Sequence, residues 1–410
     1  MNEEHKPTTD RWNLEELEAK RTIADPVADK VIAELMKEGD RSVFNDLFDA
    51  MKINSDTVPD HFPSHLKDYF NLKKDLPVWA DQHKIALGQK FFAEYGSEIS
   101  MMLFCKALPQ CYACSKGAQV MYKTERFIEK EGSFDTFTKR LVETAQFVVN
   151  IMSPGGLSPN GNGIITAQKV RLIHSTIRYY IKKGDWNTEE LGEPINQEDL
   201  VGTLMAFGPI VLEGLKKLGI NVSQEQADAY VHCWKITGYI VGVDEDLLPD
   251  SAEEGLELGL KIFDSQIAYS PEGAELIKSL ISFMEYVIPG NRFDDIAVFL
   301  LRFLLGETTA DTVRLPQPDN FRDKVFEKFL GVIFQTKDQL IDQTSFAPKL
   351  YSAFNKVFLQ GILNYYNEYG KIHFYLPKSL TKKWNLDERW DNIASSSSLF
   401  GYRASLQKKG

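Results

Sequence analysis

The 410-residue sequence predicts an all-α protein, and three observations support this fold class. Apolar residues recur at intervals of three and four, the spacing that gives a helix one apolar face. No sustained period-2 alternation, which would indicate strands, is found. Capping patterns also mark helix starts. They are Ser223 with Gln226, Ser251 with Glu254, and Ser270 followed by Pro271.

The breaks between these apolar segments are too short to be interdomain linkers, so we predict one compact helical domain over residues 1–380. They fall at 153–163, 182–194, 246–254 and 313–320. The last residues differ, because "SSSS" at 395–398 and a terminal "KKG" have no apolar periodicity. Residues 381–410 are therefore predicted to be a weakly ordered tail.

Composition narrows the class of protein. A hydrophobic content of 43% is enough for a substantial core, and a net charge of −11 leaves no basic patch for nucleic acid. The N-terminus is polar and acidic, without a secretory signal, and the apolar run "IAVFLLRFLLG" is interrupted by Arg302 and too short to span a membrane. Three of the four cysteines lie close together in a helix-patterned region, which favours reduced thiols. We therefore expect a cytoplasmic protein without a transmembrane segment.

The helix predicted over 134–152 carries two neighbouring stripes. Its core stripe is Phe134, Phe137, Leu141, Ala145 and Val148, and its second stripe is Arg140, Glu143, Thr144 and Phe147. Arg140 and Glu143 are spaced for an ion pair within the helix on a solvated surface. Alternatively, the second stripe lines a pocket, where a carboxylate held by an arginine could move protons and a hydroxyl could hold a ligand. Spacing does not choose between these interpretations.

The helix predicted over 165–181 places a histidine beside its apolar face. That face consists of Val170, Ile173, Ile177 and Ile181. His174 lies at its border, with Arg171 three residues before it and Arg178 four residues after it. This arrangement suits a haem, with imidazole for the iron and guanidinium groups for the propionates. A histidine satisfied within the core, flanked by surface ion pairs, explains the spacing equally simply.

Other candidate motifs are weaker. Cys111 and Cys114 have no second pair to complete a zinc site, and their segment "LPQCYACSKGAQV" is predicted to be helix with a structural role. His232, beside Cys233 and Trp234, is predicted to pack in the core. No nucleophile elbow, phosphate-binding glycine loop or dinucleotide fingerprint is present. Common hydrolases and nucleotide enzymes are thereby disfavoured.

Taken together, several segments resemble the rubber oxygenase catalytic-domain family, which includes bacterial latex-clearing proteins and fungal membrane-bound oxygenases that cleave prenyl chains. They occur in the family's order over residues 108–249: "LPQCYACSKGAQVMYKTERF", "RLVETAQFV", "KVRLIHSTIR", "QEDLVGTLMAFG" and "AYVHCWKITGYIVGVDEDLLP". The resemblance implies an all-helical fold with a globin-like core that holds one haem b.

By the same resemblance, His174 is the proximal iron ligand, and Arg171 and Arg178 are its supporting neighbours, expected to anchor the propionates. Arg140 and Thr144 match distal positions, and Thr203 in "VGT" matches a further pocket residue.

The sequence departs from the latex-clearing pattern at one distal position. Glu143 stands where "R-L-x-K-T" has a lysine that can cap the iron in the closed form. A carboxylate would be a different sixth ligand or would leave room for water. The family's proposed base lies just before this helix, near Thr124 and Glu125, so Glu125 and Glu143 are both candidates.

The resulting prediction is a haem b-dependent oxygenase that uses O2 on an apolar unsaturated small molecule, such as an isoprenoid or another lipid. The alternatives are a haem-binding sensor or carrier without turnover, and a haem-free helical binding protein.

Overall fold

The computed structural model describes residues 11–38, 62–72, 75–124, 135–159, 161–287, 294–317 and 380. Within these ranges no strand forms, which confirms the all-α prediction. The α-helices are α1 (Leu14–Lys20), α2 (Pro26–Glu38), α4 (Ser64–Leu72), α5 (Gln82–Met102), α6 (Leu108–Ala113), α7 (Ser115–Lys123), α8 (Asp135–Met152), α9 (Asn162–Ile181), α10 (Thr188–Leu191), α11 (Gln197–Phe207), α12 (Pro209–Lys217), α13 (Gln224–Val241), α14 (Ala252–Gln266), α15 (Pro271–Val287), α16 (Asp294–Leu305) and α17 (Glu307–Thr312). A π-helical segment, η1 (Leu103–Ala107), and a 3₁₀ turn, η2 (Glu245–Leu247), complete the set. The predicted tail, 381–410, lies outside the described residues.

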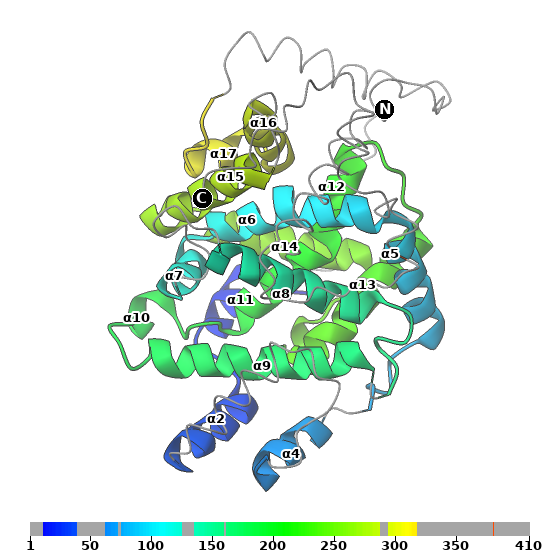
Figure 1. Cartoon of the computed structure of the whole chain (residues 1–410), viewed down its shortest axis with the longest axis vertical. Coiled ribbons are helices and arrows are strands. Elements are labelled where there is room, and N and C mark those ends of the chain that lie inside the picture. Colours follow the sequence, from blue (N-terminus) through cyan, green and yellow to red (C-terminus); the bar gives the residue numbers. More distant parts are fainter. Residues whose placement is uncertain are drawn as a thin grey trace, which may run out of the picture.

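The helices stack around α8, α11 and α13 (Figure 1). α9 packs against α8 and α13, and α2 packs on the side of α9 away from α8. α5 packs along α13, while α14 covers α11 and α12. α15, α16 and α17 gather at the opposite side of the molecule from α9. This arrangement places α8 and α9, which carry predicted site residues, in contact with each other, and α13 packs against both of them and against α11.

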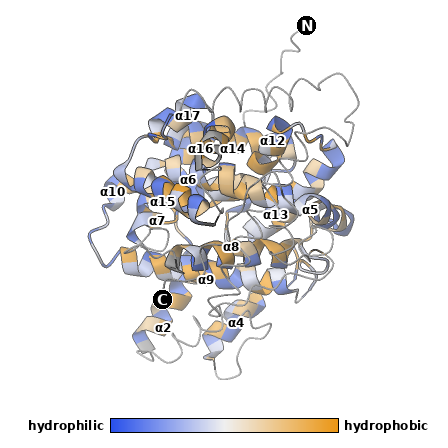
Figure 2. Cartoon of the chain, turned by 45° about the horizontal axis from the view of Figure 1, so that its top comes forward, coloured by the Kyte–Doolittle hydropathy of each residue, from blue (hydrophilic) through white to orange (hydrophobic). Residues whose placement is uncertain are grey.

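The helices carry both hydrophilic and hydrophobic residues, as amphipathic helices packed on a core do (Figure 2). The main core cluster is anchored by buried aromatic side chains, among them Phe91 of α5 and Tyr230 and Trp234 of α13. The Tyr230 hydroxyl donates a hydrogen bond of 2.9 Å to the Phe207 carbonyl at the end of α11. Burial of these rings fixes α13 against both α5 and α11, because each buries a large apolar area.

The apolar run around Arg302, which the sequence indicates is too short to span a membrane, forms α16. Arg302 is only 3% exposed. Its guanidinium pairs with Glu307 and with Asp311 at 2.6 Å, and it donates to the Leu315 carbonyl at 3.0 Å. These bonds allow a charged side chain to lie in an apolar helix. Among the described helices, none combines the length and apolar character that a membrane crossing requires.

Helices begin at all three predicted starts, and two of the three predicted caps form as expected. Ser223 and Gln226 make a reciprocal capping box, and the Ser270 hydroxyl accepts from the Gly273 N–H at 3.0 Å. The Ser251 hydroxyl accepts from the Glu254 N–H, but the glutamate does not return the bond. Instead, the Glu254 carboxylate accepts from the Asp250 N–H and pairs with Arg11 at 3.0 Å. The capping-box prediction at Ser251 is therefore only half right, since Arg11 draws the glutamate away.

The predicted helix through "LPQCYACSKGAQV" is interrupted at Cys114, whose backbone is extended at φ −74° and ψ 100°. Cys114 forms an isolated antiparallel bridge with Ile267, and the Ala268 N–H donates to the Ala113 carbonyl at 3.2 Å. Ile267 and Ala268, which directly follow α14, therefore bond to the backbone at this point in place of intrahelical partners. This contact divides the segment into α6 and α7.

His232 packs in the core, as predicted, and also caps a neighbouring helix. Its Nε2 accepts a 2.9 Å hydrogen bond from the Asp81 N–H, and its ring meets Trp79 edge to face. The Asp81 side chain in turn accepts from the His83 and Lys84 N–H groups at the start of α5. The imidazole must be neutral to accept this bond, because protonated Nε2 becomes a donor.

Stability is expected to fall as the pH falls below about 6.5, because burial, with the charges of Lys84 and Lys235, lowers the pKa of His232 to about 4. Above pH 6.5 neither state binds the proton; between 6.5 and 4 only the unfolded state binds it, so unfolding is favoured. One proton contributes at most about 1.4 kcal/mol per pH unit. Urea unfolding at pH 7, 6 and 5 should show a shallower dependence in His232→Gln than in the wild type. Equal slopes would contradict the assignment.

Candidate active site

A cavity of about 340 Å³ lies between α8, α9, α11 and the segment from η1 to α7. Most of its lining is apolar, with Leu103, Leu108, Phe147, Leu204 and Trp234 among the larger side chains. Its volume falls in the range of small-molecule sites, which are mostly apolar with a few polar groups. The polar groups come mainly from α8, α9 and α11.

His174, on α9, lies in the wall of this cavity. Burial, together with the charges of Arg140 and Arg178, lowers its pKa to about 3, so the imidazole is neutral at pH 7. Its buried Nδ1 makes no hydrogen bond within the described part of the chain. A buried ring nitrogen without a partner costs about 1–3 kcal/mol. A neutral imidazole in this setting has the chemistry of a metal ligand.

The second stripe of α8 also faces the cavity, which contains Arg140, Glu143 and Thr144 in its lining. Arg140 Nη1 lies 3.6 Å from Glu143 Oε2, so the ion pair within the helix forms as well. The Thr144 hydroxyl donates to the Arg140 carbonyl at 3.0 Å. The second stripe of α8 therefore lines a pocket, as the second of the two interpretations of the sequence has it. Its ion pair between Arg140 and Glu143 lies in a mostly apolar wall.

Arg171 and Arg178 do not line the cavity with His174. Both are buried and bound by carboxylates of the N-terminal segment. Arg171 binds Asp25 through two hydrogen bonds of 2.5 and 2.8 Å, and Arg178 binds Asp29 at 2.8 Å. Both guanidinium groups are paired with protein carboxylates in this structure, and their expected role as propionate anchors stays a prediction. The two arginines fix α9, and hence His174, against α2.

Arg178 also controls part of the cavity wall. Its Nη1 donates a 2.8 Å hydrogen bond to the carbonyl of Ile195. Ile195 lines the cavity and has φ 54°, in the left-handed region that β-branched residues rarely adopt. Backbone strain of this kind persists only where surrounding contacts hold it and is concentrated at functional sites. Arg178 supplies one such contact.

A glycine makes room for the Arg171–Asp25 pair. Gly242 ends α13 with φ 95°, and a Cβ there would lie 2.6 Å from Arg171 Nε and 2.7 Å from Asp25 Oδ2. Its carbonyl accepts a 2.9 Å hydrogen bond from Gln197 of α11. The ends of α11 and α13 therefore meet at the ion pair that positions α9.

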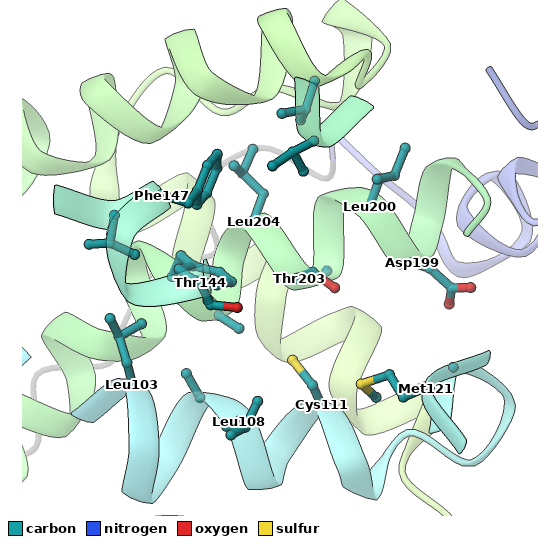
Figure 3. Close-up of a pocket in the computed structure, with 18 of the residues that line it drawn as sticks. Leu103, Leu108, Cys111, Met121, Thr144, Phe147, Asp199, Leu200, Thr203 and Leu204 are labelled. Atoms are coloured by element: carbon teal, nitrogen blue, oxygen red, sulfur yellow. The ribbon is translucent and has the colours of Figure 1, made fainter. Parts of the chain in front are cut away.

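α11 contributes Asp199 and Thr203 to the cavity lining. They are four residues apart, so they project from the same side of the helix. Figure 3 shows both side chains directed from α11 toward the wall that carries Cys111 and Met121. Thr203 thus lies at the cavity, where the family resemblance places it, whereas Asp199 was not singled out from the sequence.

The cysteines do not form a metal site. All four are free, and burial raises the pKa of Cys111 to about 12, so its thiol stays protonated. Across the described ranges, no group of three or more His, Cys, Asp or Glu side chains is placed to hold a metal ion. A haem iron bound by one histidine does not need such a group.

Of the two candidate bases, only Glu143 can be placed. Glu125 lies outside the described residues, while Thr124 lines the cavity. Phe134 of the predicted core stripe is likewise not described. No sequence pattern indicated Asp25 and Asp29 as partners of the α9 arginines, because each lies 146 or more residues from its arginine.

Comparison with known proteins identifies the family of this chain. The model of the catalytic domain shared by the ER-bound oxygenase mpaB/B′ and rubber oxygenase matches residues 113–334, more than half of the chain. The chain belongs to this family. As a distant member of the rubber oxygenase family, it is 24% identical over 296 residues to the rubber oxygenase of Streptomyces sp. (strain K30), covering 72% of this chain and 71% of that protein.

The fold agrees with a solved structure of the family. The latex clearing protein LCP in its closed state superimposes with a TM-score of 0.70, covering 84% of this chain and 91% of that one. Sequence identity between the two is 19%, so this comparison speaks for the fold. The resemblance predicted from residues 108–249 is confirmed, and the chain shares an oxygenase family whose reaction implies O2 as a substrate.

Proposed function

We propose that this protein is a haem b-dependent oxygenase that acts on an apolar unsaturated small molecule. Membership of an oxygenase family supplies the reaction class. The observation that carries the haem assignment is His174, a neutral imidazole in the wall of an apolar cavity, whose buried Nδ1 has no hydrogen-bond partner among the described residues. Haem bound there would supply O2 binding and activation.

His174 would hold the iron, and the apolar wall would hold the macrocycle. The ring is kept in place by α9, which Asp25 and Asp29 fix through Arg171 and Arg178. The surrounding apolar side chains exclude water, which strengthens the interactions of the few polar groups in the cavity.

The polar edge of α8 would steer the reacting groups. Arg140 offers hydrogen-bond donors and a positive charge, while Glu143 can hold a proton. The Thr144 hydroxyl donates its hydrogen bond to the Arg140 carbonyl, so its oxygen remains available as an acceptor toward the cavity. Arg140 Nη1 holds the Glu143 carboxylate at 3.6 Å within the same helix.

The apolar lining favours a hydrocarbon-rich substrate. Most of the side chains around the cavity are apolar, and leucine, phenylalanine and tryptophan are among the large ones. A relative in this family is a rubber oxygenase, so an isoprenoid or another unsaturated lipid is the substrate class we propose.

Oxygen consumption by the haem-loaded protein with isoprenoid alkenes tests the proposal. Arg140→Met is expected to lower the rate constant by about 10² because it removes a preorganised donor from the cavity. Lys139→Met removes a positive charge at the neighbouring position, which does not line the cavity, and should leave the rate within twofold. A haem-loaded wild type that consumes no O2 with any alkene would instead be a sensor or carrier. A protein that takes up no haem would overturn the proposal.

A further inference from the structure

The α11 side of the cavity has a polar end distinct from the Arg140 edge. Asp199 and Thr203 face it from successive turns of α11, and Cys111 lines the wall opposite. Figure 3 shows the Asp199 carboxylate at the end of the row that continues through Thr203 to Leu204. An apolar ligand lying along this row would therefore place one of its ends at Asp199.

The Asp199 carboxylate is held from behind and retains capacity on the cavity side. Its Oδ1 accepts from Arg21 at 3.0 Å and its Oδ2 accepts from Asn196 at 2.8 Å. A carboxylate has about four lone-pair sites, so two bonds leave it able to accept more. The side chain is 19% exposed, in contrast to 1% for its neighbour Glu198. Asp199 is thus the member of the pair that a ligand can reach.

Arg21 and Asn196 keep Asp199 an acceptor. Both named partners donate to it, which favours the ionised form. Burial raises the pKa of Asp199, but Arg21, Asn196 and Lys116 oppose that rise. Glu198 shares Arg21 at 2.7 Å, and burial raises its pKa to about 7.

The cations that the structure describes at this end are already paired, so none is left over for an acidic head group. Arg21 is occupied by Glu198 and Asp199, and Lys116 pairs with Glu18 at 2.8 Å. α7 passes close by, because a Cβ on Gly117 would lie 3.6 Å from Asp199 Oδ1. A carboxylate brought to Asp199 would meet a like charge in a largely apolar enclosure, whereas a hydroxyl would donate to it.

We infer that Asp199 and Thr203 select apolar substrates that end in a hydrogen-bond donor, such as a terminal hydroxyl, over those of the same carbon skeleton that end in a carboxylate. This inference rests on the proposed function, since it names the substrate class for the same cavity. Specificity would come from repulsion of the acid as well as attraction of the alcohol.

Equilibrium binding tests the inference without turnover. Geraniol, geranate and the hydrocarbon myrcene share a ten-carbon skeleton, and each is titrated calorimetrically into purified wild type, Asp199→Asn and Glu198→Gln. The wild type should bind geraniol at least about tenfold more tightly than geranate. This ratio of dissociation constants corresponds to a difference of about 1.4 kcal/mol in binding free energy. Asp199→Asn should bring the two affinities within about threefold and leave that of myrcene unchanged. Glu198→Gln, which removes a carboxylate from the same arginine away from the cavity, should keep the wild-type ratio.

Three results would overturn the inference: equal wild-type affinities for geraniol and geranate, no wild-type binding of any of the three, or an unchanged ratio in folded Asp199→Asn. The wild-type comparison decides even if Asp199→Asn fails to fold. Loss of haem binding or oxygen consumption would sink the proposed function alone, because the affinity ratio is measured independently of both.

Discussion

Asp25→Ala should lower the free energy of unfolding by about 3–5 kcal/mol, measured by urea denaturation. The change leaves the Arg171 guanidinium buried without its carboxylate, and an uncompensated buried charge is strongly destabilising. It also removes an N-cap, because Asp25 Oδ1 accepts from the Ala28 N–H at the start of α2. The loss should loosen the contact between α2 and α9.

A double replacement separates the ion pair from other effects. Asp25→Leu with Arg171→Met substitutes apolar groups for both charges, so it should recover most of the stability lost by Asp25→Leu alone. Asp185→Ala is the control: Asp185 is 92% exposed, so its ion pair with Lys123 should contribute little. If the losses in free energy of unfolding caused by Asp25→Leu and by Arg171→Met alone simply add in the double variant, the coupling that we assign to this pair is contradicted.

Gly88→Leu should destabilise the protein by about 3 kcal/mol or prevent folding, because α5 and α13 approach each other closely at this position. A Cβ at Gly88 would lie 2.5 Å from the Ala229 carbonyl oxygen and 2.8 Å from Cys233 Sγ. The oxygen belongs to the backbone of α13 and has little freedom to move. Thermal unfolding monitored by circular dichroism provides the measurement.

Gly117→Ala provides the control, since this glycine also lies within a helix but a Cβ there would make only ordinary contacts, the nearest at 3.6 Å. Alanine is favoured over glycine in a helix by about 0.5–1 kcal/mol, so this variant should be as stable as the wild type or more so. Equal stability of Gly88→Leu and the wild type would mean that α5 and α13 are not packed as described.

The helices that carry the site were predictable because their apolar periodicity is local information. α8 begins and ends within one residue of its predicted bounds, and α9 ends where expected. α9 begins at Asn162, three residues early, inside a glycine-rich segment predicted to be a break. Gly163 explains the difference, because a Cβ there would lie 2.8 Å from the Ile151 Cα atom. Its lack of a side chain allows the start of α9 to pack on the end of α8.

The partners of the site residues were not predictable from the sequence. His174 lies at the border of an apolar stripe, and helical spacing alone places the two arginines near it. Their carboxylate partners lie 146 and 149 residues away, where no local pattern links them. Spacing also suggested a direct role for Arg171 and Arg178 at the cofactor, whereas tertiary packing directs both toward α2. Asp199 escaped notice for a similar reason, since its cavity exposure depends on how α11 faces α6 and α7.

The absorption spectrum of protein purified from haem-supplemented cells, before and after dithionite, tests the central claim most directly. The wild type should show a Soret band that His174→Ala lacks while keeping wild-type helix content by circular dichroism, and free imidazole should restore the band by entering the vacated position. His232→Gln, which changes a histidine that does not line the cavity, should keep the band. Full haem occupancy in His174→Ala, or no Soret band in folded wild-type protein supplied with haem, would contradict the account.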